Sequence, residues 1–94
     1  ATPGHTPGHA SVLVEAGREQ VLIGGDALSH AVVSFRRPAW AFGSDLDRDL
    51  AARTRLTLLD RLANERMTLV GFHLPSSGVG RVERVGASYR FVQT

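Results

Sequence analysis

The chain has 94 residues, enough for one domain with a modest hydrophobic core. Hydrophobic residues make up 43% of it and charged residues 21%, which is typical of globular proteins and argues against disorder. The net charge is only +2, and the 11 basic residues, all arginine, are interleaved with acidic ones, so a nucleic-acid-binding surface is not indicated. Because there is no cysteine, a disulfide framework and a thiolate metal site are both excluded. No apolar run approaches the length of a membrane span.

The first quarter of the chain predicts a loop followed by a β-hairpin. Residues 1–9, "ATPGHTPGH", are rich in proline and glycine and are expected to form a loop. "ASVLVEA" predicts a strand at about 10–15, and the apolar run in "QVLIGGD" predicts a second strand at about 20–24. The Gly-Arg pair between them suits a turn, so the strands are expected to form a hairpin whose far end leads into Asp26.

The middle of the chain predicts a long connection and then a helix. Residues 27–46 show no hydrophobic period, and we expect a partly packed loop with at most one short turn of helix; loops of this length are often functional. The segment 47–66 predicts a helix with Asp47 as its N-cap and Ser44 as the alternative. Arginine and aspartate are expected on its outer side, opposite an apolar stripe made of Ala51, Leu58, Leu59, Leu62 and Ala63.

The end of the chain predicts three more strands. "MTLVGFH" indicates a short buried strand that ends near Gly71 and leads into His73. The alternating segments "RVERV" and "SYRFVQT", joined by a Gly-Ala turn, predict a closing hairpin.

Three residues that commonly bind metals occupy similar positions in this pattern. His5, Asp26 and His73 each follow a glycine within two residues, and the last two lie where predicted strands end. Strand ends can hold side chains over a shared point, and neutral histidine with aspartate is a ligand set that zinc and related ions prefer. Taken singly, such a histidine is more often a surface or core residue, and a Gly-Asp pair is usually a turn. Their order and context together favour a metal site.

The stretches "TPGHTPGHAS", "LIGGDALSH" and "GFHLP…GVGRV" resemble the C-terminal half of a metallo-β-lactamase-fold hydrolase. The resemblance covers nearly the whole chain, in order, and is to the branch that contains methyl parathion hydrolase and the N-acyl homoserine lactonases. It implies an α/β (α+β) fold: the C-terminal half of an αββα sandwich, a β-sheet with one main packed helix. Residues 1–94 would then be a partial domain whose N-terminal half is not in this chain.

The resemblance also implies roles for single residues. His5 would be a ligand of a first metal, Asp26 the catalytic carboxylate that bridges two metals, and His73 a ligand of the second. The metals would be two zinc ions, with manganese, iron or cobalt as alternatives. Four further residues would lie around the metals or in the pocket wall: Thr6, His9, His30 and Trp40. Ordinary loop or packing roles are the alternative for Thr6, His30 and Trp40. For His9, a supporting or packing role is favoured and direct metal contact is the alternative. Phe35 and Phe42 are further apolar candidates for that wall, and core packing is favoured for Phe35.

The chain departs from the family in one respect. The family motif His-x-His-x-Asp-His, which supplies most metal ligands, is absent, so each metal would keep only two protein ligands here. We therefore expect the chain alone to be inactive and to bind zinc weakly. The parent protein is expected to be a cytoplasmic hydrolase in which a metal-bridged hydroxide attacks an ester, lactone, amide or phosphoester. It would act on a small molecule, without nucleic-acid or membrane partners, and could form a homo-oligomer. The alternative is a non-catalytic structural or binding module that retains the scaffold.

Overall fold

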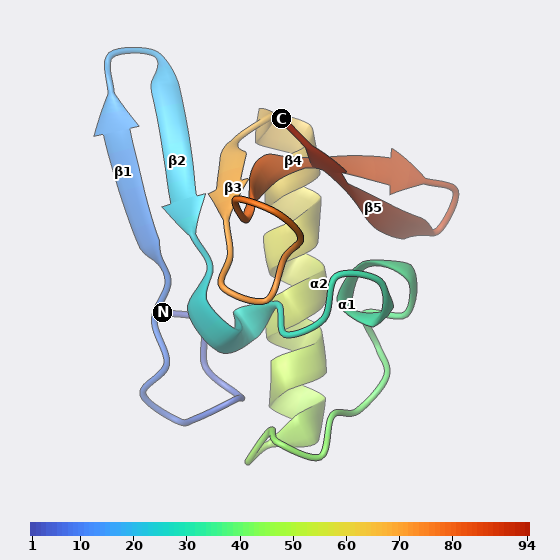
Figure 1. The fold of residues 1–94 in the computed structure, drawn as a ribbon. Helices are drawn as coiled ribbons and strands as arrows, with labels where there is room; N and C mark the ends of the chain where they lie inside the picture. The colour runs from blue at the N-terminus through green and yellow to red at the C-terminus, as the bar shows by residue number, and fades with distance from the viewer.

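The computed structural model describes residues 1–94. One mixed sheet carries all five strands in the order β1-β2-β3-β4-β5 (Figure 1). The central neighbours β2 and β3 are parallel, and every other pair is antiparallel. Both predicted hairpins and the short strand between them are confirmed, with bounds that differ by at most two residues from those expected. The strands are β1 (Val12–Ala16), β2 (Glu19–Ile23), β3 (Thr68–Val70), β4 (Val79–Val85) and β5 (Ser88–Gln93).

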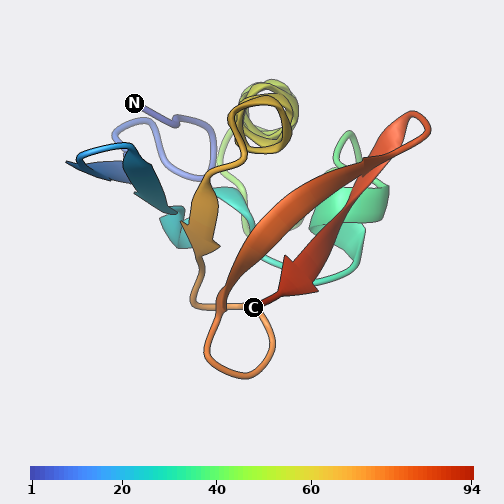
Figure 2. The same cartoon turned by 90° about the horizontal axis from the view of Figure 1, so that it is seen from above.

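The main helix, α2 (Arg48–Glu65), lies across one face of the sheet (Figures 1 and 2). Its predicted N-cap is confirmed, because the Asp47 side chain accepts a hydrogen bond from the Leu50 N–H at 3.0 Å. The helix ends at Arg66, which adopts the left-handed conformation with φ 52°. No helix of the structure is both long and apolar enough to cross a membrane.

The core lies between α2 and the sheet. Leu59 and Leu62 of the helix are fully buried, and they join Leu22 of β2 and Leu69 of β3 in one cluster. The prediction that arginines occupy only the outer side of the helix is wrong at Arg55, whose side chain is 1% exposed. This residue falls on the apolar stripe itself, and the fold accommodates its charge with hydrogen-bond partners described below.

The connection between β2 and α2 is packed onto the core. It contains two short helical turns, η1 (Gly25–Ala27) and α1 (Val33–Arg36), where one was expected. Phe35 of α1 is fully buried, and its ring lies 5.8 Å from that of Phe91 in β5. Core packing, the favoured alternative for Phe35, is therefore confirmed.

The β1–β2 hairpin has an apolar outer face. Leu13 and Leu22 point toward α2, so the alternating positions Val12, Val14 and Ile23 point the other way and are 55%, 47% and 37% exposed. Figure 2 shows α2 on only one side of this part of the sheet. The hairpin thus presents an uncovered apolar surface next to β3.

Candidate metal centre

The structure brings His5, Asp26 and His73 together from three separate segments. Asp26 lies in η1, directly after β2, and His73 lies in the loop after β3. The His73 Nε2–H donates to Asp26 Oδ1 at 2.8 Å, and His5 Nε2 lies 3.4 Å from Asp26 Oδ2. The two oxygens of one carboxylate therefore face two different imidazoles. All three side chains are accessible, at 22%, 43% and 48% exposure in chain order.

The first Pro-Gly-His unit is clamped onto the beginning of α2. Gly4 has φ 132°, and a Cβ at this position would collide with the backbone of Ala51, so the close approach requires glycine. The Gly4 carbonyl accepts from the Asp47 N–H at 2.9 Å, and the His5 carbonyl accepts from the Leu46 N–H at 3.0 Å. These contacts hold His5 in place through its own backbone.

His9 contacts Asp26 through the Asp26 backbone and not through its carboxylate. Its Nε2 accepts a hydrogen bond from the Asp26 backbone N–H at 3.0 Å, so this nitrogen carries no proton. The proton is on Nδ1, which lies 3.0 Å from the Thr2 carbonyl. Gly25, with φ 58°, allows this contact, since a Cβ there would lie 2.8 Å from His9 Nε2. Both ring nitrogens of His9 are thus occupied within the fold, which suits a supporting residue and not a metal ligand.

Two buried residues behind His5 were not predicted from the sequence. Asp45 Oδ1 lies 3.0 Å from His5 Nδ1, and Asp45 Oδ2 lies 3.5 Å from Arg55 Nη1. Both the Asp45 and Arg55 side chains are 1% exposed. Burial lowers the pKa of Arg55, and the charge of Asp45 opposes that effect. The sequence contained one signal for the burial of Arg55, namely its position four residues after Ala51 on the apolar stripe of the helix.

Charge around Asp26 favours its ionised form. The hydrogen bond from His73 is the largest effect that lowers the pKa of Asp26, and electrostatic interactions with His5, His73 and His9 act in the same direction. Partial burial opposes this shift. An ionised Asp26 beside two imidazoles is a suitable donor set for a divalent cation.

The distance between His5 and Asp26 also suits two ligands of one divalent cation. Because a carboxylate only accepts hydrogen bonds, the neutral His5 ring donates its Nδ1–H to Asp45 and turns the Nε2 lone pair toward Asp26. Two lone pairs then face one another unless a proton or cation lies between them. The observed 3.4 Å matches the spacing of about 3.4 Å expected for nitrogen and oxygen ligands of one tetrahedral zinc ion.

The chain by itself does not complete a metal site. No group of three or more histidine, aspartate or glutamate side chains is arranged so that it could hold an ion. His73 donates directly to Asp26 at 2.8 Å, closer than two ligands of one zinc ion would lie. His5, Asp26 and His73 remain candidate ligands that need further donors.

Two other predicted residues have local structural roles. His30 Nδ1 accepts from the backbone N–H groups of Val32 and Val33, both at 3.1 Å, and so binds free donors at the beginning of α1. The Thr6 side chain makes no hydrogen bond, but its carbonyl accepts from the Gly4 and His9 N–H groups at 3.0 and 3.2 Å. Thr6 therefore stabilises the loop through its main chain.

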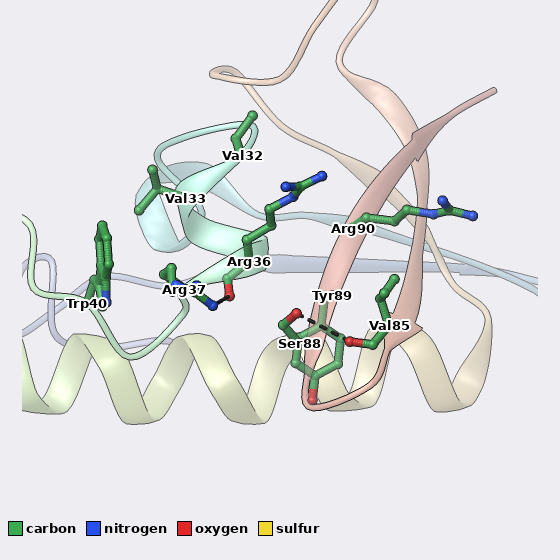
Figure 3. A pocket seen from close by; sticks show the side chains of 9 residues that line it. All are labelled: Val32, Val33, Arg36, Arg37, Trp40, Val85, Ser88, Tyr89 and Arg90. Carbon is green, nitrogen blue, oxygen red and sulfur yellow. Dashed lines mark hydrogen bonds between the residues drawn. The ribbon is translucent and has the colours of Figure 1, made fainter.

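Trp40 lines a cleft that no member of the His–Asp cluster shares. The cleft lies between α1 and the β4–β5 hairpin and has a volume of about 530 Å³ (Figure 3). Trp40 is 58% exposed at one end, with the Arg37 guanidinium 5.9 Å from its ring. Phe42 instead packs under Arg55, whose guanidinium lies 5.0 Å from its ring. The structure therefore gives no support to Trp40 as a wall of the candidate metal centre.

Comparison with known proteins assigns the fold. No family model matches the chain, and no curated protein matches it. Among solved structures, AidC, a dizinc quorum-quenching lactonase in complex with a product, N-hexanoyl-L-homoserine, has a TM-score of 0.93 and 29% identity over 99% of this chain and 32% of its own. The hydrolase AbOPH of the β-lactamase superfamily has a TM-score of 0.94 and 33% identity over 99% and 32%. The chain spans about a third of the length of these two enzymes, and over that third it has the fold of metallo-β-lactamase-superfamily hydrolases.

Proposed function

We propose that this chain is the C-terminal half of the catalytic domain of a dinuclear metal-dependent hydrolase. The observation that carries the proposal is the position of Asp26, whose two carboxylate oxygens face His5 and His73 separately. This geometry suits a carboxylate that bridges two metals, each held further by one of these histidines. The dizinc lactonase that the chain resembles supports zinc as the metal, with manganese, iron or cobalt as alternatives.

The proposed reaction is hydrolysis of a small ester, lactone, amide or phosphoester. When bound, divalent metals lower the pKa of water and polarise the bond to be cleaved. Within this chain, Asp26 would hold both metals together with His5 and His73. His9 orients Asp26 by accepting a hydrogen bond from the Asp26 backbone N–H. Similarity to a lactonase bound to an acyl homoserine product favours a lactone or a related ester among these substrates.

The remaining metal ligands, and a second sheet that covers the exposed apolar face, are proposed to come from another part of the longer protein. Two protein ligands per metal are fewer than the three or four that zinc sites normally have. The uncovered apolar face formed by Val12, Val14 and Ile23 is the surface on which a second sheet would pack. In the isolated chain, the same surface would favour self-association.

Metal titration and hydrolysis assays test this proposal. The metal-stripped 94-residue chain should bind zinc only weakly and should hydrolyse neither an aryl ester nor a lactone. The full-length protein should bind two zinc ions, and Asp26→Ala should lower its kcat/KM by at least about 10³-fold, as expected when a metal ligand set is lost. Asp60→Ala, which removes a carboxylate from the outer side of α2, is the matched control and should leave activity intact.

Two results would contradict the proposal. Full activity of the metal-free, full-length protein would exclude a metal-dependent reaction. Submicromolar zinc binding by the chain alone at two ions per chain, with turnover that depends on Asp26, would show that these 94 residues build a complete site. The second candidate function, a non-catalytic binding module, is favoured by the small ligand count alone, and an inactive full-length protein that folds and binds no zinc would support it.

A further inference from the structure

We propose that Asp45 is a positioning residue for His5, and that Arg55 anchors Asp45 for this purpose. The buried carboxylate holds the imidazole in the Nδ1–H form and directs the Nε2 lone pair toward Asp26. The inference rests on the proposed function in one respect, namely that His5 is a metal ligand. The orientation of the ring itself does not depend on any metal.

The hydrogen bonds of Asp45 show where its side chain acts. The bond between Asp45 Oδ1 and His5 Nδ1, at 3.0 Å, is the only hydrogen bond that this carboxylate makes. The other oxygen, Oδ2, is buried without a hydrogen-bond partner and faces Arg55 Nη1 at 3.5 Å. Asp45 thus connects one fixed cation to one imidazole and to no other side chain.

The cation is held more firmly than the carboxylate. Arg55 Nε donates to the Pro38 carbonyl and Arg55 Nη2 to the Trp40 carbonyl, both at 2.8 Å, and the guanidinium lies over Phe42. Because these contacts come from backbone carbonyls and an aromatic ring, Arg55 cannot turn without breaking several of them. Its charge therefore lies at a fixed position beside Asp45.

The backbone also limits the freedom of the two partners. The Leu46 N–H donates to the His5 carbonyl and the Asp47 N–H donates to the Gly4 carbonyl, so the segments that carry His5 and Asp45 run side by side. His5 is consequently fixed by its main chain and by its Nδ1–H at the same time. A ring held at two points presents its remaining nitrogen in one direction, which is what a metal ligand requires.

A purely structural role for the pair is the competing explanation. A buried ion pair contributes little net stability, because desolvation offsets the attraction between the charges. A neutral asparagine would fill nearly the same space as Asp45. A role in ring orientation explains why a charged acceptor lies at this position, since a carboxylate accepts only and admits one neutral tautomer of His5.

The test uses the full-length protein that contains this chain, labelled with ¹⁵N-histidine and stripped of metal. Long-range ¹H–¹⁵N NMR at about pH 8.5, where an ordinary imidazole is neutral, reports the tautomer of each ring. His5→Gln identifies the His5 signals. Wild-type His5 should be in the Nδ1–H form, Asp45→Asn should shift it toward a mixture or the Nε2–H form, and Asp45→Glu should restore much of the wild-type state. Asp60→Asn, in a second Asp–Arg pair, should leave the His5 signals unchanged.

Zinc titration supplies the second readout. Asp45→Asn should weaken zinc binding by about 10–100-fold, as expected when the partner of a ligating histidine is removed. An Nε2–H tautomer in the wild-type protein would overturn the proposal even if every variant failed to fold. An Asp45→Asn protein that loses stability but keeps both tautomer and zinc affinity would also overturn it and leave only the structural role. Unchanged zinc affinity in His5→Ala would instead refute the metal site, a result distinct from the tautomer measurement.

Discussion

The helix α2 contributes one residue to each of two Asp–Arg pairs, and the two pairs lie in opposite environments. Arg55, near the candidate metal centre, faces Asp45 with both side chains 1% exposed. Asp60, near the β4–β5 hairpin, binds Arg84 with the two side chains 51% and 44% exposed. Burial lowers the pKa of Arg55, whereas the bond to Asp60 raises the pKa of Arg84. For the exposed Arg84 the hydrogen-bonded partner is therefore the largest cause of the pKa shift, whereas for the buried Arg55 the largest cause is desolvation.

The two pairs also differ in the contacts that surround them. The Asp60–Arg84 pair is supplemented by the exposed Asn64 and by the hydroxyl of the buried Tyr89, while the two charged side chains themselves remain accessible to water. The Asp45–Arg55 pair is buried, and the one hydrogen bond that its carboxylate accepts comes from His5, a candidate metal ligand. The same two residue types thus have a local role at one end of the helix and an orienting role at the other.

The largest expected effect is that of removing one buried charge. Arg55→Ala leaves Asp45 buried without its cation and should lower the free energy of unfolding by about 3–5 kcal/mol. Urea unfolding of the full-length protein measures this loss. The double variant Asp45→Leu/Arg55→Met should recover most of it and still lose the His5 Nδ1–H tautomer. A double variant as unstable as the single one would show that the pair itself stabilises the fold.

The second expected effect contrasts two glycines with the same backbone conformation. Gly25 and Gly86 both have φ 58°, but a Cβ at Gly25 would meet His9, and one at Gly86 would meet nothing within 4 Å. Each change to alanine should cost about 1–2 kcal/mol through left-handed strain. Gly25→Ala should additionally displace His9 and weaken zinc binding, which Gly86→Ala should not. Equal zinc affinities in the two variants would disprove the supporting role of His9.

The third expectation concerns acid stability. The hydrogen bond from Arg84 lowers the pKa of Asp60, and that from His73 lowers the pKa of Asp26. Both carboxylates therefore contribute stability that is fully present above the ordinary value of 3.8 and is lost as the pH falls through their lowered folded values. Urea midpoints between about pH 2 and 6 should show a shallower acid loss in Asp60→Asn than in the wild type. An identical pH profile would mean that Asp60 gains nothing from its exposed partner.

The smallest expected effect is that of salt on the exposed pair. Arg84→Gln should change the unfolding midpoint only slightly at low salt, and the change should disappear near 1 M NaCl, where the screening length is about 3 Å. The effect of Arg55→Ala should persist at the same salt concentration, because its partner lies out of contact with solvent. A strong salt dependence at Arg55 would contradict the burial of that pair.

Much of the fold was predictable because its signals are local. Short apolar or alternating segments separated by turns indicated both hairpins, and the helical stripe with Asp47 before it indicated α2 and its cap. The resemblance of the glycine-flanked histidine and aspartate motifs to a known family then pointed to His5, Asp26 and His73. None of these inferences required knowledge of which segments pack together.

The sequence by itself determined the elements and the candidate ligands, whereas the tertiary structure alone decided how those ligands are held. Arg55 falls on the apolar stripe of the helix in the sequence, but only the fold brings the carbonyls that bind its guanidinium, from 15 and 17 positions away, against it. Asp45 reads as an ordinary loop residue until His5, 40 positions earlier, lies beside it. His9 is recognised as a candidate support for Asp26 only by its contact with the Asp26 backbone. Burial and hydrogen-bond partners depend on contacts between distant segments, and a periodic pattern in the sequence does not specify them.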